Sequence, residues 1–350
     1  MTGKPLEQLP IPLVEWFSEH ARVLPWRSDP TPYHVWVSEI MLQQTRVAAV
    51  LGYYQRFMDQ VPTVADLAGL PEERLMKLWQ GLGYYNRARN LQKAARQIMD
   101  EFGGVFPQRY EDIRSLAGVG DYTAGAIASI AFGLPMPAVD GNVLRVVSRI
   151  NADESDISLT STKERVREQL EQIIPVQDAS RFNQGLMELG ATVCLPNGVP
   201  LCQQCPAKEF CLARLTGCTE SLPVKAQKKE RRVEERMVFL VFRDGQVALR
   251  RRPNKGLLAG LWEFPNEVAP ATDMLSTWGI DTRDCQLVGT GRHIFTHVEW
   301  RMTACTVQAQ TQDLPEGWVW ADRSELERQY AVPNAFRPFE RIVRERLGHF

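Results

Sequence analysis

The sequence lacks an excess of charge of either sign. Its 350 residues hold 41 lysine and arginine side chains against 42 aspartate and glutamate side chains, so the formal net charge is −1. This excludes a protein that binds nucleic acid through overall basicity. Residues 74–96, however, hold six basic and no acidic side chains, and residues 221–255 hold eleven basic against four acidic ones. Basic residues can therefore still gather on one surface, although solvated helix and linker faces would explain either segment taken alone.

A long uninterrupted hydrophobic run is also missing. The longest uncharged stretch, residues 122–139, is broken by Gly133, Pro135 and Pro137, which predicts a buried helix and a turn. Near the N-terminus, Glu7 and Glu15 stand where a signal peptide needs a basic start and an apolar run. We therefore expect a cytoplasmic protein with no membrane partner, a setting in which disulfides are rare.

The length predicts about two domains, and the pattern of apolar and polar residues changes after Cys218. The first 190 residues carry helical periodicity without any alternating strand pattern. Farther on, Asp244-Gly245 separates two apolar runs, which is typical of a β-hairpin. Further strands are expected over 257–264, 286–292, 298–307 and 318–320, and helices over 272–278 and 337–347. The prediction is a multidomain chain with an all-α domain over 1–221, a basic linker over 222–236 and a smaller α+β domain over 237–350.

Four of the seven cysteines fall within eighteen residues. Cys194, Cys202, Cys205 and Cys211 follow the spacing C-x7-C-x2-C-x5-C. Four soft thiolates in one short loop suit an iron–sulfur cluster or a tetrahedral zinc ion. Zinc sites usually pair two knuckles separated by roughly 12 to 20 residues, and this loop has no such separation. The spacing favours a [4Fe-4S] cluster over zinc.

Residues 116–126 predict a helix, a glycine-containing hairpin with Gly118 and Gly120, and a second helix that begins with small residues. Such a turn presents backbone N–H groups that can hold a phosphate, although an ordinary corner between two helices has the same glycines. Downstream, Asp140 stands at the start of another helix, where a capping role is the commonest one. Alternatively, the helix-end N–H groups keep its carboxylate ionised, so that it can stabilise a cation.

Glu39 lies among bulky apolar residues in segment 36–45. A glutamate there is usually solvated on the outer face of a helix; facing a pocket, it would have a raised pKa and could donate a proton near neutral pH. Segment 81–85, with the aromatic pair Tyr84 and Tyr85 on a glycine turn, lies inside the basic stretch 74–96. The pair suits insertion between stacked bases, although a buried loop anchor has the same composition.

The combination of hairpin, downstream aspartate and four-cysteine loop resembles the endonuclease III superfamily of DNA glycosylases. Within it, the chain is similar to the MutY-type adenine DNA glycosylases over residues 13–347. The most specific segments of this resemblance are 38–45, 81–85, 139–143 and 293–297. The second domain resembles the Nudix-like 8-oxoguanine-recognition domain of that family, including the segment 260–265. The implied partner is double-stranded DNA with an A:8-oxoguanine or A:G mispair, and the implied state is a monomer.

The resemblance also implies roles for individual residues. Glu39 would protonate adenine and Asp140 would stabilise the sugar cation or trap it transiently, which is the two-carboxylate logic of glycoside cleavage. Tyr122 and Asn142 would support this pocket. Contacts to DNA or the flipped base are implied for Arg27, Gln44, Thr45, Leu82, Tyr84, Gly118, Gly120, His293, Phe295, Thr296 and His297, and ligation of a [4Fe-4S] cluster for Cys194, Cys202, Cys205 and Cys211.

One absence selects among the members of the superfamily. Bifunctional relatives use a lysine in the hairpin to attack the sugar, and here Tyr122 stands at that position, with no lysine between Lys93 and Lys163. Because a Schiff-base lyase needs an amine nucleophile, we predict a monofunctional glycosylase. The alternatives are a bifunctional pyrimidine-damage glycosylase/lyase and a non-catalytic DNA-binding module. A nucleotide pyrophosphatase is disfavoured, since residues 269–278 offer only Asp273 for magnesium.

Two positions depart from the family pattern. Seven residues separate Cys194 from Cys202, where the family commonly has six, and Thr296 stands where the family often has serine. The longer loop remains compatible with ligation by all four cysteines. Threonine keeps the hydroxyl group of serine, and its added methyl group alters the fit.

Overall fold

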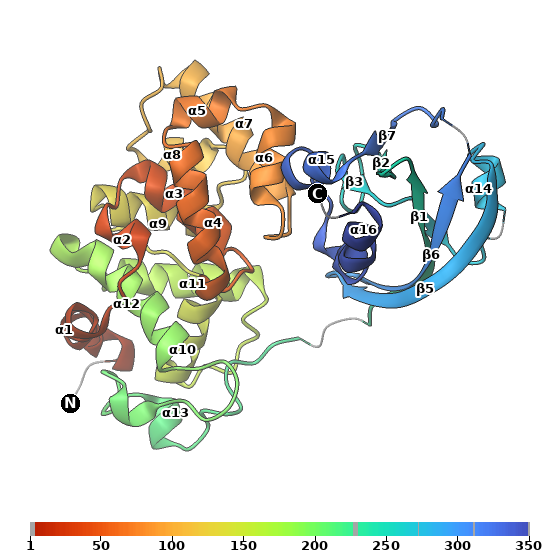
Figure 1. The fold of residues 1–350 in the computed structure, drawn as a ribbon. Helices are drawn as coiled ribbons and strands as arrows, with labels where there is room; N and C mark the ends of the chain where they lie inside the picture. Colours follow the sequence, from red (N-terminus) through yellow and green to blue (C-terminus); the bar gives the residue numbers. More distant parts are fainter. Residues whose placement is uncertain (1–3, 227–229, 272, 311, 349–350) are drawn as a thin grey trace. The chain divides into compact units, whose positions relative to one another are not determined.

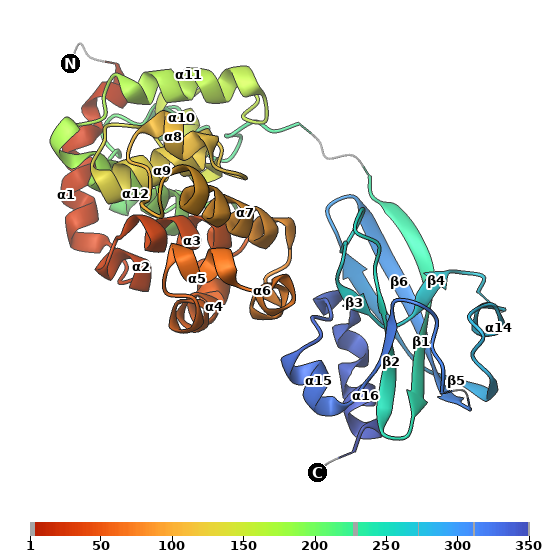
Figure 2. The ribbon, with the colours of Figure 1, turned by 90° about the horizontal axis from the view of Figure 1, so that it is seen from above.

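The computed structural model describes residues 4–226, 230–271, 273–310 and 312–348. The chain divides into two compact units (Figures 1 and 2). The helical unit comprises Met1–Gly69 and Arg89–Gln227, and the mixed unit comprises Leu70–Ala88 and Lys228–Phe350. Residues 227–229 of the expected linker and residue 272 of an expected helix lie outside the described residues.

The described part of the helical unit consists of helices and their connections, as the helical periodicity predicts. Helix α7 begins within the short segment assigned to the mixed unit and continues into the helical unit. The helices are η1 (Pro5–Gln8), α1 (Pro10–His20), α2 (Pro25–Ser28), α3 (Pro32–Leu42), α4 (Val47–Gln60), α5 (Val64–Gly69), α7 (Asn86–Glu101), α8 (Tyr110–Ser115), α9 (Asp121–Phe132), α10 (Gly141–Asn151), α11 (Thr160–Glu171), η2 (Val176–Asp178), α12 (Ala179–Thr192), η3 (Cys202–Gln204) and α13 (Leu212–Leu215).

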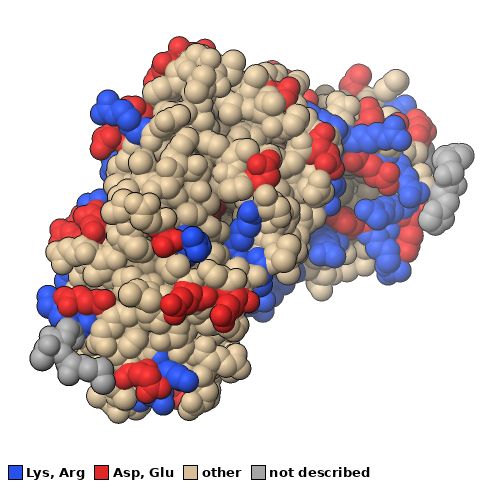
Figure 3. Space-filling view, turned by 90° about the vertical axis from the view of Figure 1, so that its left-hand side faces the viewer, with Lys and Arg blue, Asp and Glu red and all other residues tan. Residues whose placement is uncertain are grey.

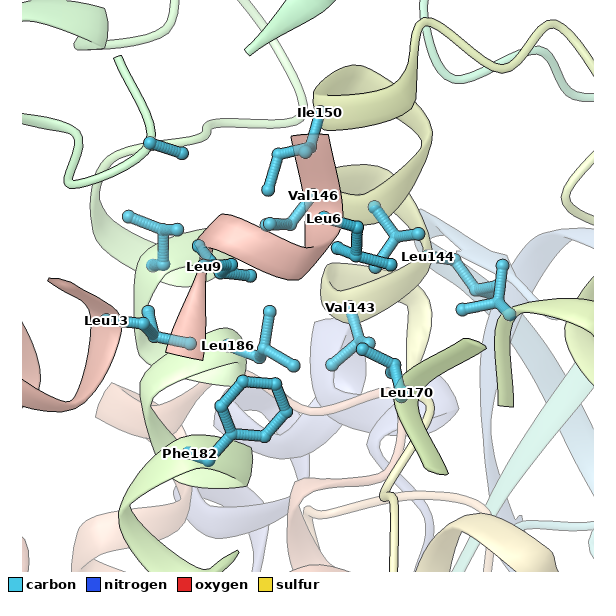
Figure 4. Packing of buried hydrophobic residues seen from close by; sticks show 14 of the residues in the cluster. Leu6, Leu9, Leu13, Val143, Leu144, Val146, Ile150, Leu170, Phe182 and Leu186 are labelled. Carbon is cyan, nitrogen blue, oxygen red and sulfur yellow. The ribbon is translucent and has the colours of Figure 1, made fainter. Parts of the chain in front are cut away.

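One core of the helical unit forms where the N-terminal helices meet α10, α11 and α12. Figure 4 shows side chains from these helices converging, among them Leu9, Val143, Leu170 and Phe182. Each of these four side chains is fully or almost fully buried. Burying apolar area is favourable by about 25 cal/mol per Å², so this core fixes the axis of α10, the helix that begins directly after Asp140.

Two glycines let helices approach the segment around Asp140 closely. A Cβ atom on Gly125 of α9 would lie 2.1 Å from the carbonyl oxygen of Pro137, and one on Gly190 of α12 would lie 2.6 Å from Cβ of Asn142. Both distances are far below van der Waals contact. The absence of a side chain at these two positions therefore sets where the 137–142 segment can lie.

The described part of the mixed unit contains a seven-stranded sheet and four helical elements besides α6 (Glu72–Trp79). The central order is β3-β2-β1-β6-β5, with β4 paired to β1 and β7 paired to β2; β1 and β6 are parallel and the other pairs antiparallel. The elements are β1 (Arg232–Arg243), β2 (Gln246–Arg251), β3 (Trp262–Glu263), β4 (Asn266–Val268), α14 (Met274–Thr277), β5 (Thr282–Ile294), β6 (Val298–Ala309), β7 (Trp318–Ala321), α15 (Arg323–Arg328), η4 (Asn334–Phe339) and α16 (Glu340–Arg346).

Both faces of this sheet are covered. Along β1, Val238 and Leu240 point into the core beneath η4 and α16, whereas Phe239 and Val241 point into the core beneath α14. Burial on both faces explains why the sequence shows a continuous apolar run here instead of alternation. The predicted hairpin is confirmed: Arg243 pairs with Gln246, and Asp244 and Gly245 both have positive φ.

Several element boundaries differ from the predictions, and three of these differences have a physical explanation. Strand β1 begins at Arg232, inside the expected linker, because its charged residues form ion pairs at the surface, such as Arg236 with Glu234. Only Trp262–Glu263 of the expected strand 257–264 pairs, since Leu258 and Gly260 have positive φ. The last expected helix starts as the 3-10 helix η4 and becomes α-helical only after Pro338. No helix in the described part of the chain has the length and apolar character needed to cross a membrane.

The close approach at Gly125 gives a stability prediction. Gly125→Ala should destabilise the protein by about 1–3 kcal/mol, because the added methyl group must displace the Pro137 backbone. Gly69→Ala is the matched control: a Cβ there meets nothing within 4 Å, so the change should be within about 0.5 kcal/mol. Urea unfolding followed by circular dichroism measures both, and equal midpoints for the two variants would contradict the predicted contact.

Candidate active site

Glu39 is a carboxylic acid buried on the inner face of α3. Its side chain is 6% exposed, and the hydroxyl group of Tyr122, at the start of α9, donates a hydrogen bond to its Oε2. Burial, the largest effect, and the negative charge of Asp140 raise the pKa of Glu39, the Tyr122 hydrogen bond and Arg27 lower it, and the result is a pKa of about 7. The structure therefore brings Glu39, Tyr122 and Asp140 into one electrostatic site, as the resemblance implies, with an acid that is partly protonated at neutral pH.

Asp140 caps the N-terminus of α10. Its Oδ1 accepts a hydrogen bond from the Val143 N–H at 2.7 Å, and its Oδ2 accepts one from Nδ2 of Asn142 at 2.8 Å. Burial raises the pKa of Asp140, whereas the Val143 and Asn142 hydrogen bonds lower it and so favour the ionised form. Desolvation outweighs the capping bonds because the carboxyl group is enclosed by the protein.

Arg145 connects Asn142 to the four-cysteine loop, a link that the sequence analysis missed. Its Nη2 donates to Oδ1 of Asn142 at 2.8 Å and to the carbonyl oxygen of Gly190 at 2.7 Å, and its Nε donates to the carbonyl oxygen of Cys194 at 2.8 Å. The side chain is 4% exposed. An arginine on the apolar face of a helix was the available signal, because such a charge needs buried acceptors. Asn142 is thus held between Arg145 and Asp140.

The four predicted ligand cysteines line one cavity between α10, α12 and the 194–211 loop. Arg149 points into it, with Nη1 3.2 Å from Sγ of Cys194, and Lys208 and Arg214 also line it. Burial raises the pKa of Cys205 to about 12, and the other three cysteines contribute to that rise. Thiolates here consequently need a cationic group among them. No set of three or more His, Cys, Asp or Glu side chains in the described ranges is arranged to hold a single metal ion.

The hairpin between α8 and α9 has the predicted form. Gly118 is exposed, with φ +76°, and Gly120 is exposed beside it, whereas Val119 between them is buried. A Cβ atom on Gly118 would lie 2.6 Å from Cβ of Asn90. Gly118 therefore lets the turn lie close against α7, whereas a Cβ atom on Gly120 would meet nothing within 4 Å.

Arg27 is held by a buried acid that the sequence did not indicate. Its Nη2 lies 2.9 Å from Oε2 of Glu188, its Nε donates to Oε1 of Gln184 at 3.0 Å, and its guanidinium lies 5.2 Å from the centre of the Phe17 ring. Glu188 is 1% exposed and also pairs with Arg22. The carboxylate lies 161 positions away along the chain, and a polar residue within the apolar helix α12 was the only signal for it.

The two segments expected to enter DNA differ in exposure. Gln44 is exposed, with φ +57°, just after α3, and Thr45 is partly buried. In the mixed unit, Tyr84 is 49% exposed, with φ +48°. Leu82 is only 6% exposed, so the expected contact between Leu82 and DNA disagrees with its position in this structure. Its apolar side chain packs inward while Tyr84 points outward.

Residues 293–297, for which the resemblance implies contacts to DNA, span the tight connection between β5 and β6. We call this segment the probing loop. The N–H of Phe295 donates to the carbonyl oxygen of Val298 at 2.8 Å, and Thr296 and His297 at the tip are exposed. The His293 and Phe295 rings are 4.5 Å apart, and burial lowers the pKa of His293. The loop thus presents a hydroxyl group and an imidazole on a packed aromatic base.

Charge lies in small groups on the face of the molecule that Figure 3 shows. On the face in Figure 3, basic and acidic side chains lie close to one another and are separated by wide uncharged areas. Opposite charges pair in several places, for example Arg165 with Asp153 and Arg114 with Asp121. The 41 basic side chains are thus accompanied by acidic ones in these places as well as in the total count.

Two family models match the chain. The model described as HhH-GPD superfamily base excision DNA repair protein matches residues 37–176, and the model of the NUDIX domain matches residues 237–340. The helical part of the chain is also similar to solved structures of a thermostable thymine-DNA glycosylase and of an endonuclease III–DNA complex. The TM-scores are 0.55 and 0.52, with 28% and 27% identity; the matches cover 61% and 62% of this chain and 98% and 99% of those chains.

Curated relatives match across both parts of the chain. The adenine DNA glycosylase of Homo sapiens is 35% identical over 94% of this chain and 73% of its own length. The adenine DNA glycosylase of Buchnera aphidicola subsp. Baizongia pistaciae is 36% identical over 75% of each chain. With its buried acid, capped aspartate and hairpin, the chain belongs to the adenine DNA glycosylase family of base excision repair enzymes.

Proposed function

We propose that this enzyme hydrolyses the glycosidic bond of adenine mispaired with 8-oxoguanine, or with guanine, in double-stranded DNA, and leaves an abasic site. The observation that carries the proposal is the buried acid Glu39. It accepts a hydrogen bond from Tyr122, and the negative charge of Asp140 raises its pKa. A protonated acid beside a carboxylate is the pair that this cleavage requires.

The chemistry follows from how adenine leaves the sugar. When the bond between C1′ and N9 breaks, its electron pair stays on adenine, and the sugar becomes an oxocarbenium-like cation. Glu39 would donate its proton to N7 of adenine, so that the base leaves neutral. Asp140 would stabilise the cation through its negative charge. Water then adds to C1′ and loses a proton, which returns the sugar to neutrality as an abasic site.

Asn142 and Arg145 would act on this step through Asp140. Asn142 donates to one oxygen of Asp140, and the N–H of Val143 donates to the other, so the carboxylate is held at a fixed angle. Arg145 holds Asn142 in turn. Two fixed donors stabilise the ionised carboxylate, which favours the form that the cation needs.

The monofunctional reaction rests on Tyr122. Its hydroxyl group points at Glu39 from the position where a lyase needs an amine nucleophile. A phenol cannot form a Schiff base with the sugar. Treatment of the enzyme with borohydride on damaged duplex should therefore give no covalent adduct, whereas the bifunctional alternative requires a strong one.

Exposed parts of both units would contact the DNA. The hairpin glycines Gly118 and Gly120 would hold a phosphate through backbone N–H groups, and Thr296 with His297 would probe the oxidised base. Adenine must leave the helix before it can react, at a cost of a few kcal/mol. Gln44 and Tyr84, both exposed, would fill or wedge the gap.

The four-cysteine loop would hold a [4Fe-4S] cluster. The donors fit the group: four sulfurs line one cavity, with Arg149 at 3.2 Å from Cys194 to offset thiolate charge. A cluster binds each cysteine to a different iron atom, whereas a zinc ion gathers all four sulfurs at about 2.3 Å. The close spacing of the four cysteines, without two separated knuckles, favours the cluster. When bound, the cluster would cross-link the loop that Arg145 and Arg149 contact.

The test of the function is base release from a duplex with one A:8-oxoguanine pair, with G:C and thymine-glycol duplexes as controls. Release of free adenine from the first duplex alone is the expected result. Release from the thymine-glycol duplex would favour the pyrimidine-damage alternative. No release from any duplex, with binding retained, would favour the non-catalytic alternative.

The two carboxylates give a prediction about rate. Glu39→Gln and Asp140→Asn should each lower the single-turnover rate of adenine release by about 100-fold or more, because they remove the proton donor and the anion. Both variants should still bind the duplex in a fluorescence anisotropy assay. Glu164→Gln, at an exposed position on α11, is the matched control and should react like the unaltered protein. Unchanged turnover of either active-site variant would overturn the assignment.

The raised pKa of Glu39 predicts a pH dependence. Since the acid must be protonated to react, the single-turnover rate should fall as the pH rises through about 7. The Tyr122 hydrogen bond stabilises the charged form and lowers the pKa of Glu39, so Tyr122→Phe should move the falling limb to higher pH. A limb that stays in place, or moves to lower pH, would contradict the contact.

The cysteine cavity predicts a metal content. The purified protein should contain about four iron atoms and four sulfide ions per chain, measured by chemical analysis and visible absorption. Cys205→Ser should reduce the iron content. Cys218→Ser, which changes a cysteine that does not line the cavity, should leave it intact. Stoichiometric zinc in place of iron would contradict the cluster.

A further inference from the structure

In the mixed unit, helix α6 is attached to the C-terminal end of α15. Nζ of Lys77 donates to the carbonyl oxygens of Leu326 at 2.7 Å and Tyr330 at 3.0 Å. The last carbonyl groups of a helix lack donors within it and attract cations, so Lys77 caps α15. The half-buried ammonium group loses hydration there, which lowers the pKa of Lys77 to about 8 while Glu327 and Glu340 oppose the shift.

The turn that follows α6 is attached to the same region. Nε2 of Gln80 donates to the carbonyl oxygen of Val332 at 2.8 Å, and Nδ2 of Asn334 donates to the carbonyl oxygen of Gly81 at 3.0 Å. These contacts join the start of the turn to Val332, which lies between α15 and η4, and to Asn334, the first residue of η4. Because Gly81 has φ +105°, its backbone is already committed to a conformation that other residues rarely adopt.

The far side of the turn is held from within its own segment. Nε1 of Trp79 donates to the carbonyl oxygen of Gly83 at 3.1 Å, and Nη2 of Arg87 donates to the carbonyl oxygens of Leu82 and Gly83 at 3.2 Å each. The guanidinium of Arg87 lies 5.6 Å from the centre of the Tyr84 ring. The exposed Tyr84 thus stands on a turn that is fixed at both ends.

A packed series of aromatic rings connects this attachment to the probing loop. Phe295 in the loop lies 4.9 Å from Trp300, and Trp300 lies 6.2 Å from Phe336, measured between ring centres. Phe336 is fully buried and belongs to η4, whose first residue is Asn334. Closely packed side chains transmit displacements because the interior has little free volume.

We propose that Lys77, Gln80 and Asn334 are positioning residues that set the Gly81–Tyr85 turn according to the base that the Phe295–His297 loop meets. The inference rests on the proposed function, since it assigns 8-oxoguanine recognition to that loop and wedging to Tyr84. These three side chains touch neither adenine nor its sugar in this account; they act through the turn. Their effect is therefore on discrimination between the bases opposite adenine.

The experiment measures single-turnover adenine release from A:8-oxoguanine and A:G duplexes. The variant Lys77→Met, Asn334→Ala should lower the first rate more than the second, so that the ratio of the two rates falls by about fivefold. Lys77→Arg, which keeps donors for both carbonyl groups, should restore most of the ratio. Lys163→Met on α11 changes an exposed lysine and should leave the ratio as it is. When Thr296→Val is already present, adding Lys77→Met and Asn334→Ala should lower the ratio less, because the loop has already lost its hydroxyl group.

The outcomes separate the inference from the function on which it rests. If the double variant lowers the rates on both duplexes by the same factor, so that their ratio is unchanged, the inference is overturned, since a purely structural role lowers both rates alike. If the double variant does not fold, Asn334→Ala alone, which removes one hydrogen bond from an exposed side chain, must still lower the ratio. If the unaltered protein releases no adenine, the proposed function is refuted instead. If the unaltered protein releases adenine equally fast from both duplexes, it does not discriminate between 8-oxoguanine and guanine, and the inference fails with it.

Discussion

The burial of Glu39 is the constraint on which the rest of the site depends. A carboxyl group in water has a pKa of about 4 and would be ionised at neutral pH, unable to donate a proton. Enclosure on α3, with a smaller contribution from the charge of Asp140, raises the pKa to about 7. Each unit of pKa corresponds to about 1.4 kcal/mol, so the fold stabilises the protonated acid at the expense of its charged form. The hydrogen bond from Tyr122 reduces that rise in pKa and holds the Glu39 side chain in place.

The second carboxyl group is held by helix geometry and close packing. Asp140 can cap α10 only if the 137–142 segment lies against α9 and α12, and Gly125 and Gly190 leave the space for it. Asn142 and Arg145 then join this cap to the carbonyl oxygen of Cys194. The cysteine loop and the candidate active site thus share one set of buried hydrogen bonds, and in a low dielectric such bonds are strong when complete and costly when broken.

Local patterns in the sequence predicted what depends on neighbouring residues. The Asp244-Gly245 hairpin, the helices of the first 190 residues and the capping position of Asp140 all follow from short-range rules. Contacts between distant positions did not: nothing near Arg27 indicates Glu188. The raised pKa of Asp140 was missed for the same reason, because burial is set by the whole fold. Strand β1 was placed late because its charged residues pair at the surface of the folded unit.

The most direct measurement is a titration of Glu39 itself. The infrared difference between the unaltered protein and Glu39→Gln isolates the protonated carboxyl band of this one side chain. The band should be present at pH 6 and half lost near pH 7. Loss of the band near pH 4, the ordinary range of an exposed glutamate, would show that Glu39 is ionised at neutral pH and would contradict its role as the proton donor.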